Sequence, residues 1–341
     1  MNPVFVIDKD GYKYAVSSKV CNRSELYVGA SGSGKTSCML KRIVTLVEEG
    51  AKVINIAFAG SWMREGFSEK LLSRYGELTT HISAKSGLSL PLSDATNGFR
   101  SLEVARLLSK SIGLSPTREA ALVIALKKAC LDGAVGEEGL GVISRYLTRM
   151  DTSAASVAAA KLDQFLDGVL VQDGALDFSR PILEISFDGL LLEQQVALVE
   201  LLLETLLRAG ENGAFGQEHI VVAIDEFQFL SGERFSALRS LLEVGRKGGI
   251  SLLLATPELP LSKQAASYVA MQQCATVAFF KPGVTECRKL ARIIAPREVP
   301  QWTLELSMLS RGDFVVMGEF LTENGSIANG PIIATMPDVR S

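Results

Sequence analysis

Short apolar runs alternate with amphipathic stretches along most of this 341-residue chain. The runs are apolar almost throughout, which is typical of strands buried on both faces, and the stretches between them repeat apolar residues at helical spacing. This alternation predicts an α/β fold with a mainly parallel sheet and helices on both faces. The expected strands are ELYVG (25–29), AKVINIAFAG (51–60), PILEISF (181–187), HIVVAID (219–225), ISLLLAT (250–256) and ATVAFF (275–280), and the main expected helices end at Gly50 or cover 190–208 and 234–246.

Two segments differ from this alternation. The opening VFVIDKDGYKYAV alternates apolar and polar residues around Asp10 and Gly11, which predicts a β-hairpin. Residues 99–168 read as helices only, one of them starting at Ser115 and Pro116. We therefore expect the hairpin and the first part of a core domain in 1–98, an all-helical insertion in 99–168, and the remainder of the core in 169–341.

Composition limits the function classes. With 47% hydrophobic residues the chain can build a large core, and a net charge of −3 gives no global electrostatic footprint for nucleic acid. The five cysteines are scattered and the only histidines are His81 and His219, so no metal-binding spacing is present and reduced thiols in a cytoplasmic protein are expected. Neither a signal peptide nor a run of 18 apolar residues is visible, so no membrane span is expected.

A phosphate-binding loop follows the first expected strand of the core. The stretch GASGSGKT, residues 29–36, fits the spacing G-x-x-x-x-G-K-[ST], in which backbone N–H groups surround phosphates at a helix N-terminus. The lysine reaches the β- and γ-phosphates and the hydroxyl after it completes the shell of Mg²⁺. ATP is therefore expected to bind Gly29, Ala30, Ser31, Gly32, Ser33, Gly34, Lys35, Thr36 and Ser37, with Thr36 as a metal ligand.

An acidic pair follows another expected strand. Five apolar residues, 220–224, deliver Asp225 and Glu226 to the carboxyl end of a buried strand, where α/β sheets bind ligands. Asp225 is expected to hold Mg²⁺, and Glu226 to polarise the attacking water as general base. Taken alone, such a pair is equally often the solvated start of a loop.

The stretch GRKGG, residues 245–249, leaves two interpretations open. Arg246 is either an arginine finger for the nucleotide of a neighbouring subunit or a cation that stabilises a helix C-terminus.

These segments together resemble the HerA and FtsK class of P-loop ring ATPases, which includes the ATPases of conjugation and type IV secretion. The matching stretches are YVGASGSGKTS as Walker A, PILEISFDGLLLEQQVALVELLLETLL, VVAIDEFQFL as Walker B, GRKGGISLLLAT as the sensor strand, and LSMLSRGDFVVMGEF with an L-x-x-G turn before a strand. The resemblance implies a RecA-like core of the ASCE type, with Glu226 as the glutamate of Walker B. It also implies a homohexameric ring with ATP between subunits and double-stranded DNA in the pore.

Two departures from the class concern the site. Ala255 and Thr256 are followed by Pro257 where the class often has glutamine, so Thr256 is the remaining candidate for sensing the γ-phosphate. The acidic residue that many members carry after the second strand is missing, because Ala57 and Ser61 stand there.

The function expected from the resemblance is a DNA-translocating ATPase. The alternatives are a subunit that uses nucleotide to hold a ring together for a partner nuclease or a secretion or conjugation channel, and a motor that packages a viral genome. Basic pairs such as Lys127 with Lys128, or Arg145 with Arg149, are either pore-facing or a solvated helix face.

Overall fold

A computed structural model of the chain describes residues 5–16, 23–58, 67–90, 101–167, 169, 171–230, 236–257 and 266–337. Its main sheet has 13 strands, and seven consecutive ones run parallel. In spatial order these seven are β11 (Thr276–Phe280), β3 (Glu25–Val28), β10 (Ile250–Thr256), β9 (Ile220–Ile224), β4 (Lys52–Ala57), β8 (Ile182–Ser186) and β5 (Thr79–Ser83). All six strands expected from the sequence are among them.

Beyond β11 the sheet continues with antiparallel strands, so the sheet is mixed rather than mainly parallel. The predicted hairpin is present, and its first strand pairs with a strand near the other end of the chain. Stacked aromatic rings, Phe5 on Phe320, fix this junction of N- and C-terminal segments. In spatial order the extension is β12 (Asp313–Met317), β15 (Ile332–Thr335), β1 (Val6–Asp8), β2 (Lys13–Val16), β13 (Glu319–Thr322) and β14 (Ile327–Asn329).

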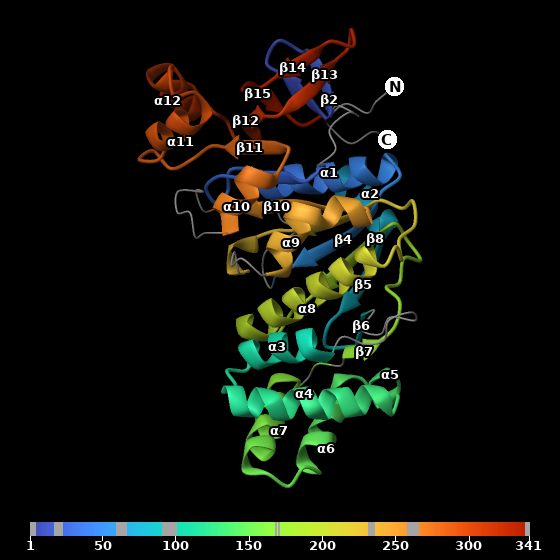
Figure 1. Cartoon of the computed structure of the whole chain (residues 1–341). Helices are drawn as coiled ribbons and strands as arrows, with labels where there is room; N and C mark the ends of the chain where they lie inside the picture. Colours follow the sequence, from blue (N-terminus) through green and yellow to red (C-terminus); the bar gives the residue numbers. More distant parts are fainter. Residues whose placement is uncertain are drawn as a thin grey trace.

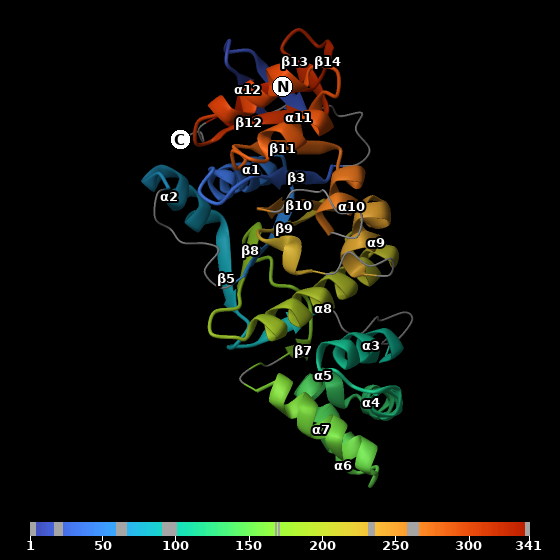
Figure 2. The same ribbon diagram turned by 90° about the vertical axis from the view of Figure 1, so that its left-hand side faces the viewer.

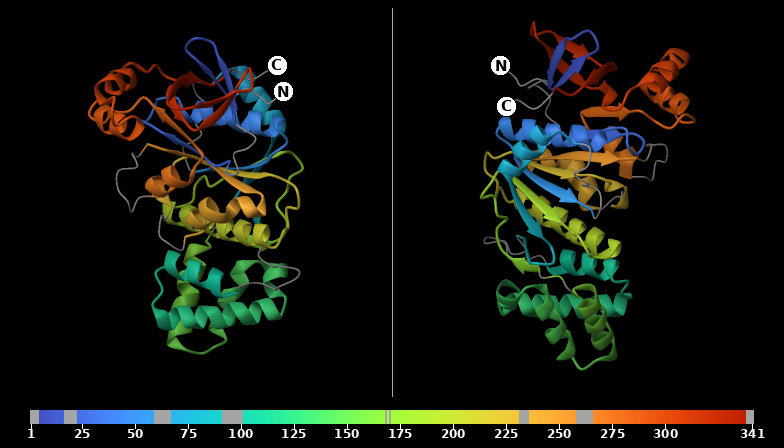
Figure 3. Two further views of the ribbon diagram at one scale, coloured as in Figure 1. Left: turned by 45° about the horizontal axis from the view of Figure 1, so that its top comes forward. Right: turned by 180° about the vertical axis from the view of Figure 1, so that it is seen from behind.

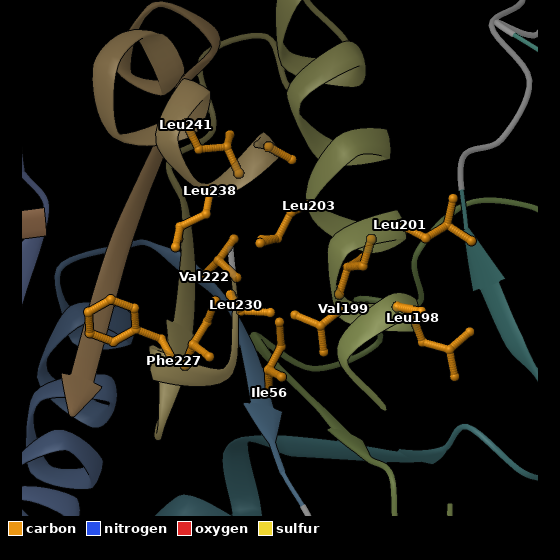
Figure 4. Close-up of a cluster of buried hydrophobic side chains, with 14 of the residues drawn as sticks. Ile56, Leu198, Val199, Leu201, Leu203, Val222, Phe227, Leu230, Leu238 and Leu241 are labelled. Carbon is orange, nitrogen blue, oxygen red and sulfur yellow. The ribbon is translucent and has the colours of Figure 1, made fainter. Parts of the chain in front are cut away.

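Helices cover both faces of the sheet (Figures 1 and 2). On one face lie α1 (Lys35–Glu48) and α2 (Glu69–Leu78), and on the other α8 (Leu192–Glu211), α9 (Ala237–Val244) and α10 (Ala266–Gln273). Alternate residues of one strand enter different cores: Tyr27 packs in the α1 core, and Leu26 and Val28 in the α8 core. Figure 4 shows the second core, where side chains of α8 and α9 meet Ile56 and Val222.

A small helical hairpin, α11 (Cys287–Ile294) and α12 (Val299–Met308), lies beside the antiparallel extension (Figure 3).

Five further helices lie beyond α8, on its side away from the sheet (Figure 1). They are α3 (Ser101–Ser111), α4 (Pro116–Leu131), α5 (Ala134–Glu138), α6 (Ile143–Thr148) and α7 (Ser153–Phe165), with a short 3₁₀ turn, Leu140–Val142. As predicted, α4 begins at the proline. Two short strands that the sequence pattern does not predict, β6 (Leu88–Leu90) and β7 (Val171–Asp173), pair in parallel and join the two ends of this segment.

The helical segment packs against α8 through the shared apolar core and is also bonded to it. Gln194 Nε2, at the first turn of α8, donates a 2.6 Å hydrogen bond to the carbonyl of Phe165 at the end of α7. In the part of the chain that the structure describes, no helix has the length and apolar character needed to cross a membrane.

Beneath the phosphate-binding loop, an ion pair joins β3 to α1. Arg42 Nε and Nη2 each lie 2.8 Å from Glu25 Oε1, and both side chains are only 4% exposed. Arg42 also contacts Glu49 at 2.9 Å, and its guanidinium lies 4.8 Å from the ring centroid of Phe5. Removing one partner of such a pair leaves the other charge buried without compensation.

We expect Arg42→Met to lower the free energy of unfolding by about 3–5 kcal/mol, because Glu25 would remain buried and unpaired. Denaturant unfolding at neutral pH measures this loss. The control is Arg74→Ala, which removes the ion pairs of a 40% exposed side chain with Glu48 and Glu77; it should change stability by no more than about 0.5 kcal/mol. Equal losses in the two variants would contradict the prediction.

Candidate nucleotide-binding site

The loop between β3 and α1 is held at the carboxyl edge of the sheet by both neighbouring strands. The N–H of Gly29 donates to the carbonyl of Thr256 at the end of β10 (3.3 Å), and the N–H of Ala30 donates to that of Lys281 just after β11 (3.2 Å). A Cβ at position 29 would lie 2.7 Å from Phe280 Cβ, so only glycine permits this approach. The sequence motif is therefore a strand–loop–helix unit, as predicted.

Lys35, the first residue of α1, is 7% exposed and bends back over the loop. Its Nζ donates to the carbonyls of Gly29 (2.7 Å) and Ala30 (3.0 Å). Burial lowers the pKa of Lys35, while the charges of Asp225 and Glu226 oppose this shift. Because an ammonium group has three donors, one N–H remains for a ligand.

The rest of the loop fits an anion. The hydroxyl of Ser33 is buried and has no hydrogen-bond partner among the described residues. Gly32 and Gly34 have φ values of 76° and 100°, a region in which side chains are strained. A buried donor without a partner and a turn of glycines at a helix N-terminus are what a phosphate-binding loop requires.

The candidate metal ligands lie together. Thr36 Oγ1 donates a 2.8 Å hydrogen bond to Asp225 Oδ2, so residues 189 positions apart in sequence meet at the loop. Asp225 is 4% exposed and its other oxygen accepts from the N–H of Glu226 (3.0 Å). Burial raises the pKa of Asp225, while the Thr36 hydroxyl and the Lys35 charge oppose the shift. A hydroxyl and a carboxylate are oxygen ligands that suit Mg²⁺.

Glu226 has an unusual backbone for a residue with a side chain, with φ of 60° and ψ of 39°. Non-glycine residues in this left-handed region are enriched at functional sites. Burial and the neighbouring Asp225 raise the pKa of Glu226, with Lys35 opposing. The short 3₁₀ turn Phe227–Phe229 follows and buries Phe227, which fixes the direction of the chain after Glu226.

Thr256 lies at the base of the loop. It is fully buried at the end of β10, in register with Val28, and its carbonyl holds Gly29. Ala57 is the last residue of β4, and Ser61 lies outside the described residues.

Arg246 does not join this site within the chain. It is exposed in the 3₁₀ turn Gly245–Gly248, which precedes β10, whereas the loop adjoins the other end of that strand. Seven residues of strand separate the two ends by about 20 Å. Among the described residues none forms an ion pair with Arg246. The turn is fixed by a close backbone approach to the end of α8, since a Cβ at Gly248 would lie 2.7 Å from Gly210 Cα.

A turn that the sequence reading gave no role in the site packs against the loop from the other side. The N–H of Gly312 donates to the carbonyl of Ser33 (2.9 Å), and a Cβ at Gly34 would lie 2.8 Å from Gly312 N. The L-x-x-G pattern, residues 309–312, was the available signal, but it carries no information on which loop the turn contacts.

Comparisons of the whole chain show similarity at the level of structure. Neither a protein-family model nor a curated protein sequence matches. The structure is similar to VirB4 of Thermoanaerobacter pseudethanolicus, with a TM-score of 0.70 and 14% identity over 99% of this chain and 97% of that chain. It is also similar to the plasmid coupling protein TrwB in complex with the ATP analogue ADPNP, with a TM-score of 0.59 and 13% identity over 94% of this chain and 86% of that chain. For TrwB with ADP and Mg²⁺ the TM-score is 0.58 and the identity 14%, over the same shares of the two chains.

These similarities cover nearly the whole chain, including the helical segment and the antiparallel extension. The resemblance predicted from the sequence motifs is confirmed at the level of the fold: this chain has the RecA-like P-loop fold of the VirB4 and TrwB ATPases.

Proposed function

We propose that this protein is a Mg²⁺-dependent ATPase of the ASCE type. The observation that carries the proposal is the hydrogen bond between Thr36 and Asp225, which joins the two nucleotide-binding motifs at one point. The ASCE assignment is supported by the strand order, since β10 lies between the strands that bear these motifs, and by Glu226 next to Asp225. ATP analogues and ADP with Mg²⁺ bound to TrwB support the same ligands here.

In this proposal each residue has one task. Backbone N–H groups in residues 31–37 surround the phosphates, because those of Gly29 and Ala30 are bonded to Thr256 and Lys281. Lys35 turns its remaining N–H toward the β- and γ-phosphates. Mg²⁺, held by Thr36 and Asp225, would neutralise charge that develops on the phosphates. Glu226 accepts a proton from water, and Thr256 supports the loop near the γ-phosphate.

We further propose that the protein acts as a hexameric ring that translocates double-stranded DNA, with helices α3–α7 as an insertion (99–168) between the parts of the core, 1–98 and 169–341. The likeness to TrwB, a bacterial conjugative coupling protein, supports a motor of this kind. The second candidate is a subunit that uses nucleotide to hold a ring together for a partner nuclease or a secretion channel. The likeness to VirB4 supports this candidate as much as it supports the motor.

Glu226→Gln should lower ATP turnover by about 10² to 10⁴ and leave ATP binding intact, because the carboxylate serves water rather than affinity. Lys35→Ala should instead weaken nucleotide binding itself, since it removes a charge from the phosphates. Phosphate release and equilibrium binding distinguish the two effects.

The pH profile gives a second readout. Burial and Asp225 raise the pKa of Glu226. Turnover of the parent protein should therefore fall as the pH drops through this pKa, because the base becomes protonated, and Glu226→Gln should lose this acidic limb of the profile. Parental turnover in Glu226→Gln would exclude this glutamate as the base.

Arg246 is expected to complete the site of the adjacent subunit, because it lies far from its own loop. Such a finger contributes about 10³ to 10⁵ in rate, so Arg246→Ala and Lys35→Ala rings should each be nearly inactive. Mixed rings contain interfaces with an intact Lys35 and an intact Arg246, so mixing should restore measurable ATPase. Labelled subunits show whether the two variants exchange between rings. If they exchange and ATPase activity still does not recover, Arg246 is a helix-terminal or DNA-facing cation rather than a finger.

Duplex DNA is expected to stimulate ATP hydrolysis, and the stimulation should fade with rising salt, because DNA binding releases counterions. ATPase rates with and without duplex across a salt series, with particle mass measured in parallel, provide the test. Equal rates at low salt in a verified ring would favour the assembly subunit.

A further inference from the structure

The turn before β12 approaches the phosphate-binding loop on the side opposite the acidic pair. From β3, the sheet runs through β10 to β9 and its Asp225 in one direction, and through β11 to β12 in the other. Because β12 is antiparallel to β11, with Phe314 opposite Phe280, its first residue lies at the same edge as the loop. The loop therefore lies between the carboxylates and the turn of residues 310–313.

This turn is built against the loop rather than merely near it. In addition to the bond from Gly312 N to Ser33 O, the Cys38 thiol in the first turn of α1 donates to the Gly312 carbonyl (3.8 Å). Gly312 has φ of 93°, and Ser310 N donates to Asp313 Oδ2 (3.2 Å), which closes the turn. Contacts at both the loop and the helix fix where the turn presents its side chains.

Arg311 is the cation that the turn presents. Its Cγ lies 3.6 Å from the position of a Cβ on Gly34, so the side chain begins directly beside the loop. The residue is exposed, and neither a hydrogen bond nor an ion pair joins its guanidinium to any described residue. The buried Ser33 hydroxyl without a partner lies in the same segment of the loop.

We propose that Arg311 binds the α- or β-phosphate of the nucleotide held by its own subunit, a proposal that rests on the ATPase function proposed above. Glu226 must lie near the γ-phosphate to act on water, so a cation on the opposite side of the loop faces the inner phosphates. A guanidinium is suited to this, since its planar donors bind phosphate oxygens in pairs. Arg311 is then a binding residue that ADP and ATP use equally.

The test compares the affinities of Arg311→Ala, Arg311→Lys and parent for Mg²⁺-ADP and for a non-hydrolysable ATP analogue. We expect Arg311→Ala to weaken both ligands by the same factor, about ten- to hundredfold, as the loss of a charged hydrogen bond implies. Arg311→Lys should recover part of the affinity, because it retains the charge. The matched control is Arg297→Ala, another exposed arginine without an ion-pair partner among the described residues, and it should bind as the parent does.

Thermal unfolding of the ligand-free variants separates binding from a structural role. An unchanged melting temperature with equal loss of both ligands supports the proposal. Parental affinity in Arg311→Ala overturns it, as does a loss confined to the ATP analogue, which would move Arg311 to the γ-phosphate. A lower melting temperature of ligand-free Arg311→Ala, together with no recovery of nucleotide affinity in Arg311→Lys, also overturns it. A parent that binds neither nucleotide would overturn the ATPase function as well, so the two failures are distinguishable.

Discussion

The backbone N–H groups that a loop offers to an anion cannot also stabilise the loop, so its shape must be held by its remaining polar groups and by other parts of the chain. Here the holding contacts are Gly29 to Thr256, Ala30 to Lys281, and Gly312 to Ser33. They come from the ends of β10 and β11 and from the turn before β12. The loop is local in sequence, but its conformation depends on strands that are contributed more than 200 residues later.

Burial disfavours the charged forms of the ionisable side chains around the loop. Burial lowers the pKa of Lys35 and raises that of Asp225, and each opposes the shift of the other. Burial and Asp225 also raise the pKa of Glu226. The backbone of this residue lies in the left-handed region. Such a cluster is least unfavourable when phosphates and a divalent cation supply further opposite charges, which is the electrostatic reason to regard it as a ligand site.

How far the sequence could predict this structure depended on the range of the interactions. The strands around Asp225 and Gly29 were predictable because burial on both faces leaves apolar runs and the motif spacing is local. The pairing of β1 with β15 was not, since short half-exposed strands carry no sign of their partner. The position of Arg246 at the opposite edge of the sheet required the strand directions, and the contact of Gly312 with Ser33 required the strand order. Both are properties of the assembled sheet.

The helix α8 contacts two different parts of the protein at its two ends. At one end Gln194 is bonded to the helical segment, and at the other Gly210 lies in backbone contact with Gly248 in the turn that carries Arg246. A helix of 20 residues is about 30 Å long and is stiff over that length. It therefore fixes the spacing between the helical segment and the arginine turn, because one stiff and largely buried element contacts both.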